Sequence, residues 1–236
     1  MSIDPDLLRG FTVFSALSAE ERRALAHAAS LRALRANEAV FVQGQPAAEL
    51  CLVLSGRIKL SKAGWARDPV ILRIAHPGEF LELARSVRPA GGYDVTATAL
   101  CSAELAVWPT QVWRRLVDEI PAMMPCLAQL LEQELSDAQG RFVEIASLDV
   151  PRRIAHALLR LVNQAGRKEA AGIRIDFPLS QQDLAALTGT TLFTVSRTLT
   201  CWERRGLLAG GRRTVLVRDL SALTNLATAA EANFGA

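Results

Sequence analysis

The sequence is poor in the residues from which enzymes most often build active sites. It holds three histidines and one tyrosine. It also lacks an HExxH motif, a phosphate-binding glycine loop and a recognisable nucleophile–base–orienter set. Its four cysteines, Cys51, Cys101, Cys126 and Cys201, are widely separated and form no CxxC pair. This spacing argues against the usual zinc and iron–sulfur sites and fits a reducing compartment. We therefore expect neither an enzyme nor a metal site.

Long apolar runs and a signal-like start are missing as well. No run approaches the roughly 20 apolar residues that a membrane span needs, and the opening MSIDPDLLRG lacks a basic segment followed by an apolar one. Half of the 236 residues are nevertheless apolar, which is enough for two domains that each bury a core. The sequence predicts a cytoplasmic globular protein with no membrane partner.

The charge is divided unevenly along the chain. Residues 151–236 contain 12 Lys and Arg against 6 Asp and Glu, whereas residues 1–150 contain 15 against 18. Neutralisation of phosphates dominates binding to nucleic acid, so the C-terminal surplus indicates a polyanionic partner. Arginine-rich surfaces also occur without such a partner, and the charge alone does not establish one.

The stretch Gln181–Gly206 predicts two short helices around a tight turn. The first runs over about 181–188 and the second over about 191–203, with Gly189 supplying a positive φ between them. The apolar residues with three- and four-residue spacing are Leu184, Ala185, Leu187, Val195, Leu199 and Trp202. This pattern is typical of a helix-turn-helix, whose second helix enters the DNA major groove. An ordinary helical hairpin explains the buried pattern equally well.

The outward side of the second helix separates these two interpretations. A helical hairpin does not explain Leu192 and Phe193 on that side, whereas Arg197 is the residue type that binds guanine O6 and N7 bidentately. A β segment at Arg212–Val217 would form a wing along the phosphates. The expected DNA-binding residues are Gln181, Gln182, Thr191, Leu192, Phe193, Thr194, Ser196, Arg197, Arg212 and Arg213.

Upstream of this segment the pattern is helical, then β-rich, then helical again. Residues 1–36 look helical, with a capping box at Ser18 before Ala19–Ala29. Short β runs with glycine and proline turns then predict an antiparallel sandwich or barrel. These runs are Ala39–Val42, Leu50–Leu54, Arg57–Lys62, Val70–Ala75, Val95–Leu100 and Glu104–Val107.

A long amphipathic helix is predicted over about Pro125–Ala146. Its apolar stripe consists of Leu127, Leu130, Leu131, Leu135, Ala138, Phe142 and Ile145. Such a helix either packs on its own domain or pairs with a second copy, and we favour a dimer seam. The fold class is therefore α+β, with a β-roll sensor domain at 1–124, a dimerisation helix at 125–147 and a winged helix-turn-helix at 148–236.

The order of these elements and several motifs resemble the CRP/FNR family of transcription regulators. The motifs are Gln43-Gly44, LVLSGRIKL at Leu52–Leu60, His76–Phe80, SLDVPRRIAHALLRL at Ser147–Leu161 and the helix-turn-helix sequence at Leu179–Leu199. The resemblance implies a cyclic-nucleotide-binding-like roll and a homodimer on palindromic double-stranded DNA, with RNA polymerase as an additional partner. Activator and repressor cannot be distinguished, because polymerase contacts lie on variable loops.

Departures from the family pattern bear on the ligand. Cyclic-nucleotide-binding members carry Gly-Glu followed by Arg-Ser or Arg-Thr, in which arginine neutralises the cyclic phosphate. Here these positions read Glu82-Leu83 and Tyr93-Asp94, and the adenine-facing position of the long helix is Ala138. Cyclic AMP is therefore not expected as effector. An iron–sulfur cluster is not expected either, because the first cysteine is Cys51.

The helix-turn-helix sequence resembles that of the nitric-oxide-responsive, NnrR-like branch of the family. This resemblance implies a haem that senses nitric oxide in the control of nitrogen-oxide metabolism. A haem needs an axial base in an apolar pocket, and His76 is the expected ligand. His27 and His156 are the other candidates, and Cys101 and Met123 are more distant ones. Two further readings stay open: an effector-independent regulator, and a haem-binding sensor module with no direct role on DNA.

A second departure concerns the DNA site. Many members carry a glutamate on the recognition helix that accepts a hydrogen bond from cytosine N4, and that position is Phe193 here. A phenyl ring cannot accept this bond. The resemblance therefore implies a half-site that differs from the common TTGA or TGTGA type at one base.

Overall fold

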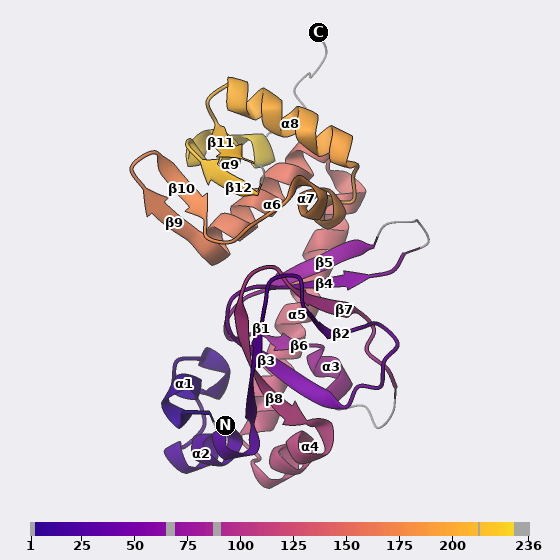
Figure 1. Ribbon diagram of the computed structural model, residues 1–236, viewed down its shortest axis with the longest axis vertical. Coiled ribbons are helices and arrows are strands. Elements are labelled where there is room, and N and C mark those ends of the chain that lie inside the picture. Colours follow the sequence, from indigo (N-terminus) through magenta and orange to yellow (C-terminus); the bar gives the residue numbers. More distant parts are fainter. Residues whose placement is uncertain (1–2, 65–68, 87–90, 212, 229–236) are drawn as a thin grey trace. The chain divides into compact units, whose positions relative to one another are not determined.

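The computed structural model describes residues 3–64, 69–86, 91–211 and 213–228. The chain divides into two compact units, Met1–Gln139 and Gly140–Ala236. The division falls inside one long helix, α5 (Met123–Ser147), which begins two residues before the predicted start (Figure 1). The predicted α+β class, with a β-roll followed by a helix-turn-helix, is confirmed.

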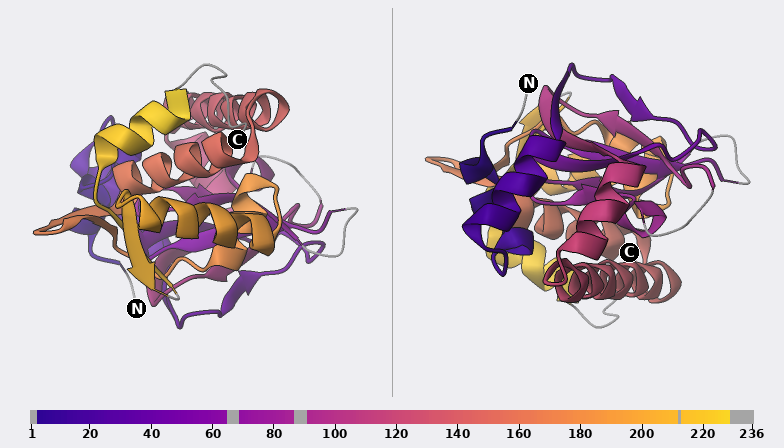
Figure 2. Two further views of the ribbon diagram at one scale, coloured as in Figure 1. Left: turned by 90° about the horizontal axis from the view of Figure 1, so that it is seen from above. Right: turned by 90° about the horizontal axis from the view of Figure 1, so that it is seen from below.

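Short helices begin the N-terminal unit. They are α1 (Pro5–Arg9), the 3-10 turn η1 (Thr12–Phe14) and α2 (Ala19–Ala28). The predicted capping box is present: Ser18 Oγ accepts from the Glu21 N–H at 3.2 Å, and the Glu21 carboxylate accepts from the Ser18 N–H at 2.7 Å. These helices and α4 (Thr110–Glu119) lie at one end of the roll (Figure 2, right).

Two four-stranded antiparallel sheets form the roll. One has the order β1-β8-β3-β6 and the other the order β2-β7-β4-β5. The strands of the first are β1 (Ser30–Leu34), β8 (Ala103–Pro109), β3 (Glu49–Ser55) and β6 (Phe80–Leu81). Those of the second are β2 (Ala39–Phe41), β7 (Thr96–Ala99), β4 (Ile58–Lys62) and β5 (Val70–Ala75). Strand β1 corrects the expectation of helix up to residue 36, and the short helix α3 (Leu83–Ser86) follows β6.

Apolar side chains of the roll pack in two clusters. One joins the helices to the first sheet and centres on aromatic rings, with Trp108 and Trp113 centroids 5.4 Å apart. Trp108 Nε1 donates to the Leu25 carbonyl at 2.9 Å, so this buried polar atom is satisfied. The other cluster fills the space between the sheets and contains Cys51, Tyr93 and Phe41.

The C-terminal unit sets helices against a four-stranded sheet of order β11-β12-β10-β9. Its helices are α6 (Val150–Ala165), α7 (Gln181–Thr188), α8 (Leu192–Arg204) and α9 (Leu220–Thr228). Its strands are β9 (Gly166–Glu169), β10 (Gly172–Ile175), β11 (Leu208–Gly211) and β12 (Thr214–Val217). Asp149 caps α6, and α9 lies alongside α6 (Figure 2, left). Strand β9 pairs antiparallel with β10.

Candidate functional site

A tight left-handed turn joins α7 to α8. Gly189 has φ +62°, and its N–H donates to the Ala185 carbonyl, which also accepts from the Thr190 N–H at 3.0 Å. A Cβ at Gly189 would meet nothing within 4 Å, so glycine is favoured by the backbone conformation and not by lack of space. The bounds of α7 agree with the sequence prediction because Ser180 and Asp183 form a capping box at its start.

Helix α8 buries one face and exposes the other. Val195, Leu199 and Trp202 are buried, as their spacing predicts. At the first residue of the helix Leu192 is 46% exposed, and on the side opposite the buried residues Phe193 is 69% exposed. The remaining predicted contact residues of this helix divide by exposure: Thr191, which is the N-cap, and Arg197 are exposed, and Thr194 and Ser196 are half-buried. An outward surface with one large apolar ring and one cation is therefore built on a firmly packed helix.

Arg197 lies over the ring of Phe193, one helical turn earlier. Its guanidinium carbon is 5.8 Å from the ring centroid, within the range of a cation–π contact. From Leu192 to Cys201 the helix contains no carboxylate that would pair with this cation. The four-residue spacing of the two residues is visible in the sequence, but their mutual contact was not predicted.

The wing and the start of α7 flank this surface. The Gly211 N–H donates to Thr214 Oγ1 at 3.1 Å, and the Arg213 carbonyl accepts from the Leu179 N–H at 3.0 Å, which ties the wing to the segment before α7. The Arg213 side chain is exposed, whereas the predicted contact residue Arg212 lies outside the described residues. In the first turn of α7, Gln181 is half-buried and Gln182 is exposed.

A side chain that the sequence did not single out joins this region to the end of α5. Arg153 on α6 donates to the carbonyls of Ile145 at 3.3 Å and Leu148 at 3.5 Å, and to the carbonyl of Gly189 at 3.4 Å. It thereby caps α5 and contacts the turn of the helix-turn-helix at once. Nothing in the local sequence distinguishes this arginine from its neighbour Arg152.

In the roll, Tyr93 lies at the position where the family pattern has a phosphate-binding arginine. Its ring stacks on Phe41, with centroids 3.7 Å apart and planes 9° apart. Its hydroxyl donates to the Glu49 carbonyl at 2.8 Å and accepts from the Glu49 N–H at 3.2 Å. Burial raises the pKa of Tyr93 to about 12 and that of the neighbouring Cys51 thiol to about 12. Both groups are therefore neutral parts of a packed interior.

Carboxylates stand beside this position. Glu82 has φ +56°, a left-handed conformation that is costly for a residue with a side chain. Its carboxylate accepts from the Asp94 N–H at 2.9 Å, and the Asp94 side chain is exposed. The two segments that would hold a cyclic phosphate thus meet, and Tyr93 stands where the family pattern has the neutralising arginine.

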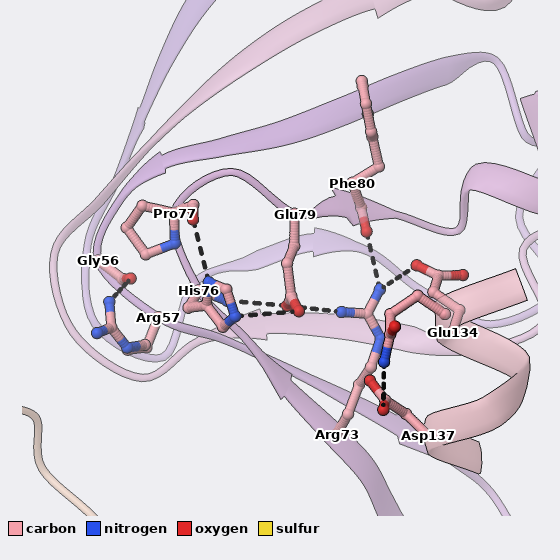
Figure 3. A network of polar contacts seen from close by, with 10 residues as sticks. Gly56, Arg57, Arg73, His76, Pro77, Glu79, Phe80, Glu134 and Asp137 are labelled. Atoms are coloured by element: carbon pink, nitrogen blue, oxygen red, sulfur yellow. Dashed lines mark hydrogen bonds and ion pairs between the residues drawn. The ribbon is translucent and has the colours of Figure 1, made fainter. Parts of the chain in front are cut away.

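His76 lies in a polar turn between β5 and β6 (Figure 3). Its Nδ1 is 3.0 Å from the Pro77 carbonyl oxygen and its Nε2 is 3.2 Å from Glu79 Oε1. Both ring nitrogens are engaged, and the side chain is about one-third exposed. Glu79 also accepts from Arg73, which reaches Glu134 of α5 at 3.0 Å. An iron at Nε2 would have to displace the Glu79 carboxylate, and the surroundings are not the apolar pocket that haem requires.

The other candidate ligands are dispersed. His27 is exposed, His156 Nε2 is 3.2 Å from the Ala227 carbonyl, and Met123 is buried in the core of the first unit. Cys101 is half-buried. Across the part of the chain that the structure describes, no three His, Cys, Asp or Glu side chains gather in a way that could hold a metal ion.

The apolar stripe of α5 divides into two parts. Leu127 is buried in the core of its own unit, and Leu130 and Leu131 pack against that core. These three side chains pack within the chain, which is the alternative to a dimer seam. The exposed part comprises Leu135, Ala138, Phe142 and Ile145, with Phe142 71% exposed.

Comparisons with known proteins agree with this architecture. Residues 31–119 match the cyclic nucleotide-binding domain family and residues 152–226 match the Crp-like helix-turn-helix domain family. The chain is 28% identical to the cyclic AMP receptor protein of Thermus thermophilus over 93% of its length and 98% of that protein. It is also 28% identical to the nitrogen fixation regulation protein FixK of Bradyrhizobium diazoefficiens, over 86% of its length and 84% of that protein.

Among solved structures, FixK2 from Bradyrhizobium japonicum superimposes with a TM-score of 0.74 at 21% identity, covering 86% of this chain and 99% of that one. This likeness concerns the fold. Within the described ranges, none of the helices has the length and apolar character needed to cross a membrane.

Proposed function

We propose that this chain, a CRP/FNR-type DNA-binding transcription regulator, works as a cytoplasmic homodimer on a two-fold symmetric DNA site. The observation that carries the proposal is the outward face of α8, which follows the left-handed turn at Gly189 and presents Arg197 on a helix whose other face is buried. In a dimer, two such helices would enter major grooves one helical turn apart.

In this proposal the contacts divide into base reading and phosphate binding. Arg197 reads guanine, and the exposed apolar residues Leu192 and Phe193 face the groove where glutamate stands in many relatives. Gln182 at the start of α7 and Arg213 on the wing bind phosphates, joined by Arg212 and Gln181. The half-site therefore departs from the TTGA or TGTGA type at the base that glutamate reads.

The dimer seam is proposed for the exposed stripe of α5. Leu135, Phe142 and Ile145 are all more than half exposed, and together with Ala138 they follow three- and four-residue spacing. A surface stripe of this kind on a long helix is typical of a pairing surface. RNA polymerase is proposed as a further partner of the DNA-bound dimer, as an activator would require.

The effector is proposed to be a gas, a redox signal or another small signal, and not cyclic AMP. Support comes from Tyr93, whose ring and hydroxyl are both engaged inside the roll, and from the carboxylates of Glu82 and Asp94 beside it. A cyclic phosphate would meet negative charge there, with Tyr93 in place of the arginine that neutralises it. A regulator that needs no effector is the alternative.

Nitric oxide sensed through haem, in control of nitrogen-oxide metabolism, is the most specific form of this proposal. It requires Glu79 to leave His76 Nε2, because that contact occupies the nitrogen that would bind iron. An absorption spectrum of anaerobic protein supplied with haem tests it. A Soret band that nitric oxide shifts and that is lost in His76→Ala supports the proposal, and absence of a band overturns it.

Selection of DNA sites from a pool of random duplexes tests the main proposal. The full-length protein should return a symmetric site, bind it with a steep dependence on salt, and lose guanine discrimination in Arg197→Ala. Thr228→Ala, far from α8 in sequence, serves as a control that should bind normally. Failure to retain any duplex at low salt would contradict a DNA-binding role and favour a sensor module that acts without DNA.

A further inference from the structure

Phe193 and Arg197 form one unit on the outward face of the recognition helix. We propose that this unit reads a guanine together with a thymine one or two base steps away: Arg197 binds the guanine and Phe193 contacts the thymine methyl while holding Arg197 in place. This inference rests on the proposed binding of α8 in the major groove. It assigns the specificity of that helix to a pair of side chains.

The exposure of Phe193 points to an apolar partner. The side chain is 69% exposed, although its helix is already anchored by three buried residues on the opposite face, so packing within the chain does not account for it. The thymine methyl is the large apolar group that a base edge presents in the major groove. A phenyl ring has no atom that accepts a hydrogen bond from cytosine N4 or adenine N6, which leaves the methyl as its target.

The distance between the two side chains sets the spacing of the two bases. The Arg197 guanidinium carbon lies 5.8 Å from the Phe193 centroid, and successive bases on one strand are about 3.4 Å apart along the helix axis. One or two base steps therefore separate the guanine from the thymine.

The ring also restricts the arginine. A long side chain loses rotamer freedom when it binds, and a guanidinium already held over an aromatic face loses less. No carboxylate between Leu192 and Cys201 competes for it. Phe193 is therefore a positioning residue for Arg197 as well as a reader of its own base.

Replacement of thymine by deoxyuridine removes the methyl group and leaves every hydrogen-bonding group of the base in place. In the site selected by the full-length protein, each thymine is replaced singly, and the dissociation constant is measured at one salt concentration. One thymine in each half-site, within two steps of the Arg197 guanine, should weaken binding about fourfold, the effect of burying one methyl-sized group. The other thymines should have no effect.

Two variants separate reading from positioning. Phe193→Ala should abolish the deoxyuridine effect and also reduce discrimination for the guanine, whereas Phe193→Leu should keep the methyl effect and reduce only the guanine discrimination. Leu220→Ala is the control at an exposed apolar residue outside α7, α8 and the wing, and it should keep both. In the double variant with Arg197→Ala, the losses should be less than multiplicative, because the two residues act together. Thermal unfolding checks that each variant is folded.

The outcomes are distinguishable. If no thymine responds to deoxyuridine while Arg197→Ala still relaxes one guanine, the inference about Phe193 is overturned and the proposed function stands. If Phe193→Ala retains the methyl effect, a different residue reads the thymine and the inference fails. If the full-length protein selects no site, the proposed function itself fails.

Discussion

Tyr93 links the fold of the roll to the absence of a phosphate-binding cation. The Ala48 carbonyl accepts from the Thr110 N–H at 2.8 Å, so the backbone groups of Glu49, one residue later, point away from β8. The Tyr93 hydroxyl instead bonds both the carbonyl and the N–H of Glu49, while its ring stacks on Phe41. Tyr93, which stands in place of the phosphate-binding arginine, thus completes the backbone hydrogen bonding of Glu49 at the start of β3.

Removing only the hydroxyl should therefore be costly. Tyr93→Phe keeps the stacked ring but leaves the Glu49 carbonyl without this donor, and we expect a loss of about 1–2 kcal/mol in the free energy of unfolding. Phe41→Leu is the complementary change, because it breaks the stack and keeps the hydroxyl, with an expected loss of about 1 kcal/mol. Urea denaturation at pH 7 measures both. A Tyr93→Phe variant as stable as the parent would contradict this role of the hydroxyl.

Cys51 makes the fold sensitive to alkali. Burial raises the pKa of its thiol from 9.0 to about 12. Below pH 9 the thiol is protonated in both states, but between pH 9 and 12 the unfolded chain releases a proton that the folded chain retains, so stability falls as pH rises. Cys51 should contribute a fall of about 1–2 kcal/mol by pH 10.5.

The measurement is the difference in urea midpoint between pH 8 and pH 10.5. Cys51→Ala should lose less stability over this interval than the parent, although it starts from a lower value because of the lost packing. Cys101→Ala, at a half-buried thiol of the same unit, is the matched control. Equal pH dependence in all three proteins would refute the assignment.

At the scale of elements, the exposed stripe of α5 carries the dimer proposal. Phe142→Glu places a charge at the most exposed large apolar side chain of this helix and should raise the dimer dissociation constant at least tenfold. Ser136→Glu introduces the same charge on the opposite face of the helix and should leave the dimer intact. Sedimentation velocity over a range of concentrations compares the two. A monomeric parent protein would falsify the proposed seam outright.

Elements with strong local signals could be predicted from the sequence, and those made by distant pairing could not. Ser180 and Gly189 set the ends of α7 through a capping box and a left-handed turn, both of which are local. Strand β1 forms because it pairs with β8, more than 70 residues away, and its own sequence has no clear alternation. Strand β9 is exposed at every residue and exists only as the partner of β10.

The candidate sites follow the same division. The outward face of α8 follows from helical periodicity, so its exposed residues could be found in advance. The contact between Arg73 and Glu134 joins β5 to a helix some 60 residues later, and the contacts of Arg153 reach two separate turns. Such contacts depend on packing, which no local pattern encodes.

At the scale of the whole molecule, the uneven charge predicts how DNA binding responds to salt. Residues 151–236 carry 12 Lys and Arg against 6 Asp and Glu. Arg213→Ala should weaken binding about equally on all duplexes and lower the slope of log affinity against log salt by about 1, because one phosphate contact is lost. Arg197→Ala should instead cost about 1–3 kcal/mol on the selected site and relax one base position.

Titrations of both variants at four or more salt concentrations distinguish these effects. Arg167→Ala, at an exposed cation on β9 away from the wing in sequence, is a control for loss of charge alone. A base preference that changes in Arg213→Ala but not in Arg197→Ala would reverse the proposed division of contacts.

The packed interior of the roll has a thermodynamic consequence for the protein as a whole. A receptor whose pocket is open in the free state gains stability by linkage, as RT ln(1 + [L]/Kd), when its nucleotide binds. Here Tyr93 and Phe41 already pack in that interior. The roll is therefore stabilised by contacts within the chain, and its stability does not depend on the concentration of cyclic nucleotide in the cell. The melting temperature of this regulator should be the same with and without millimolar cyclic AMP.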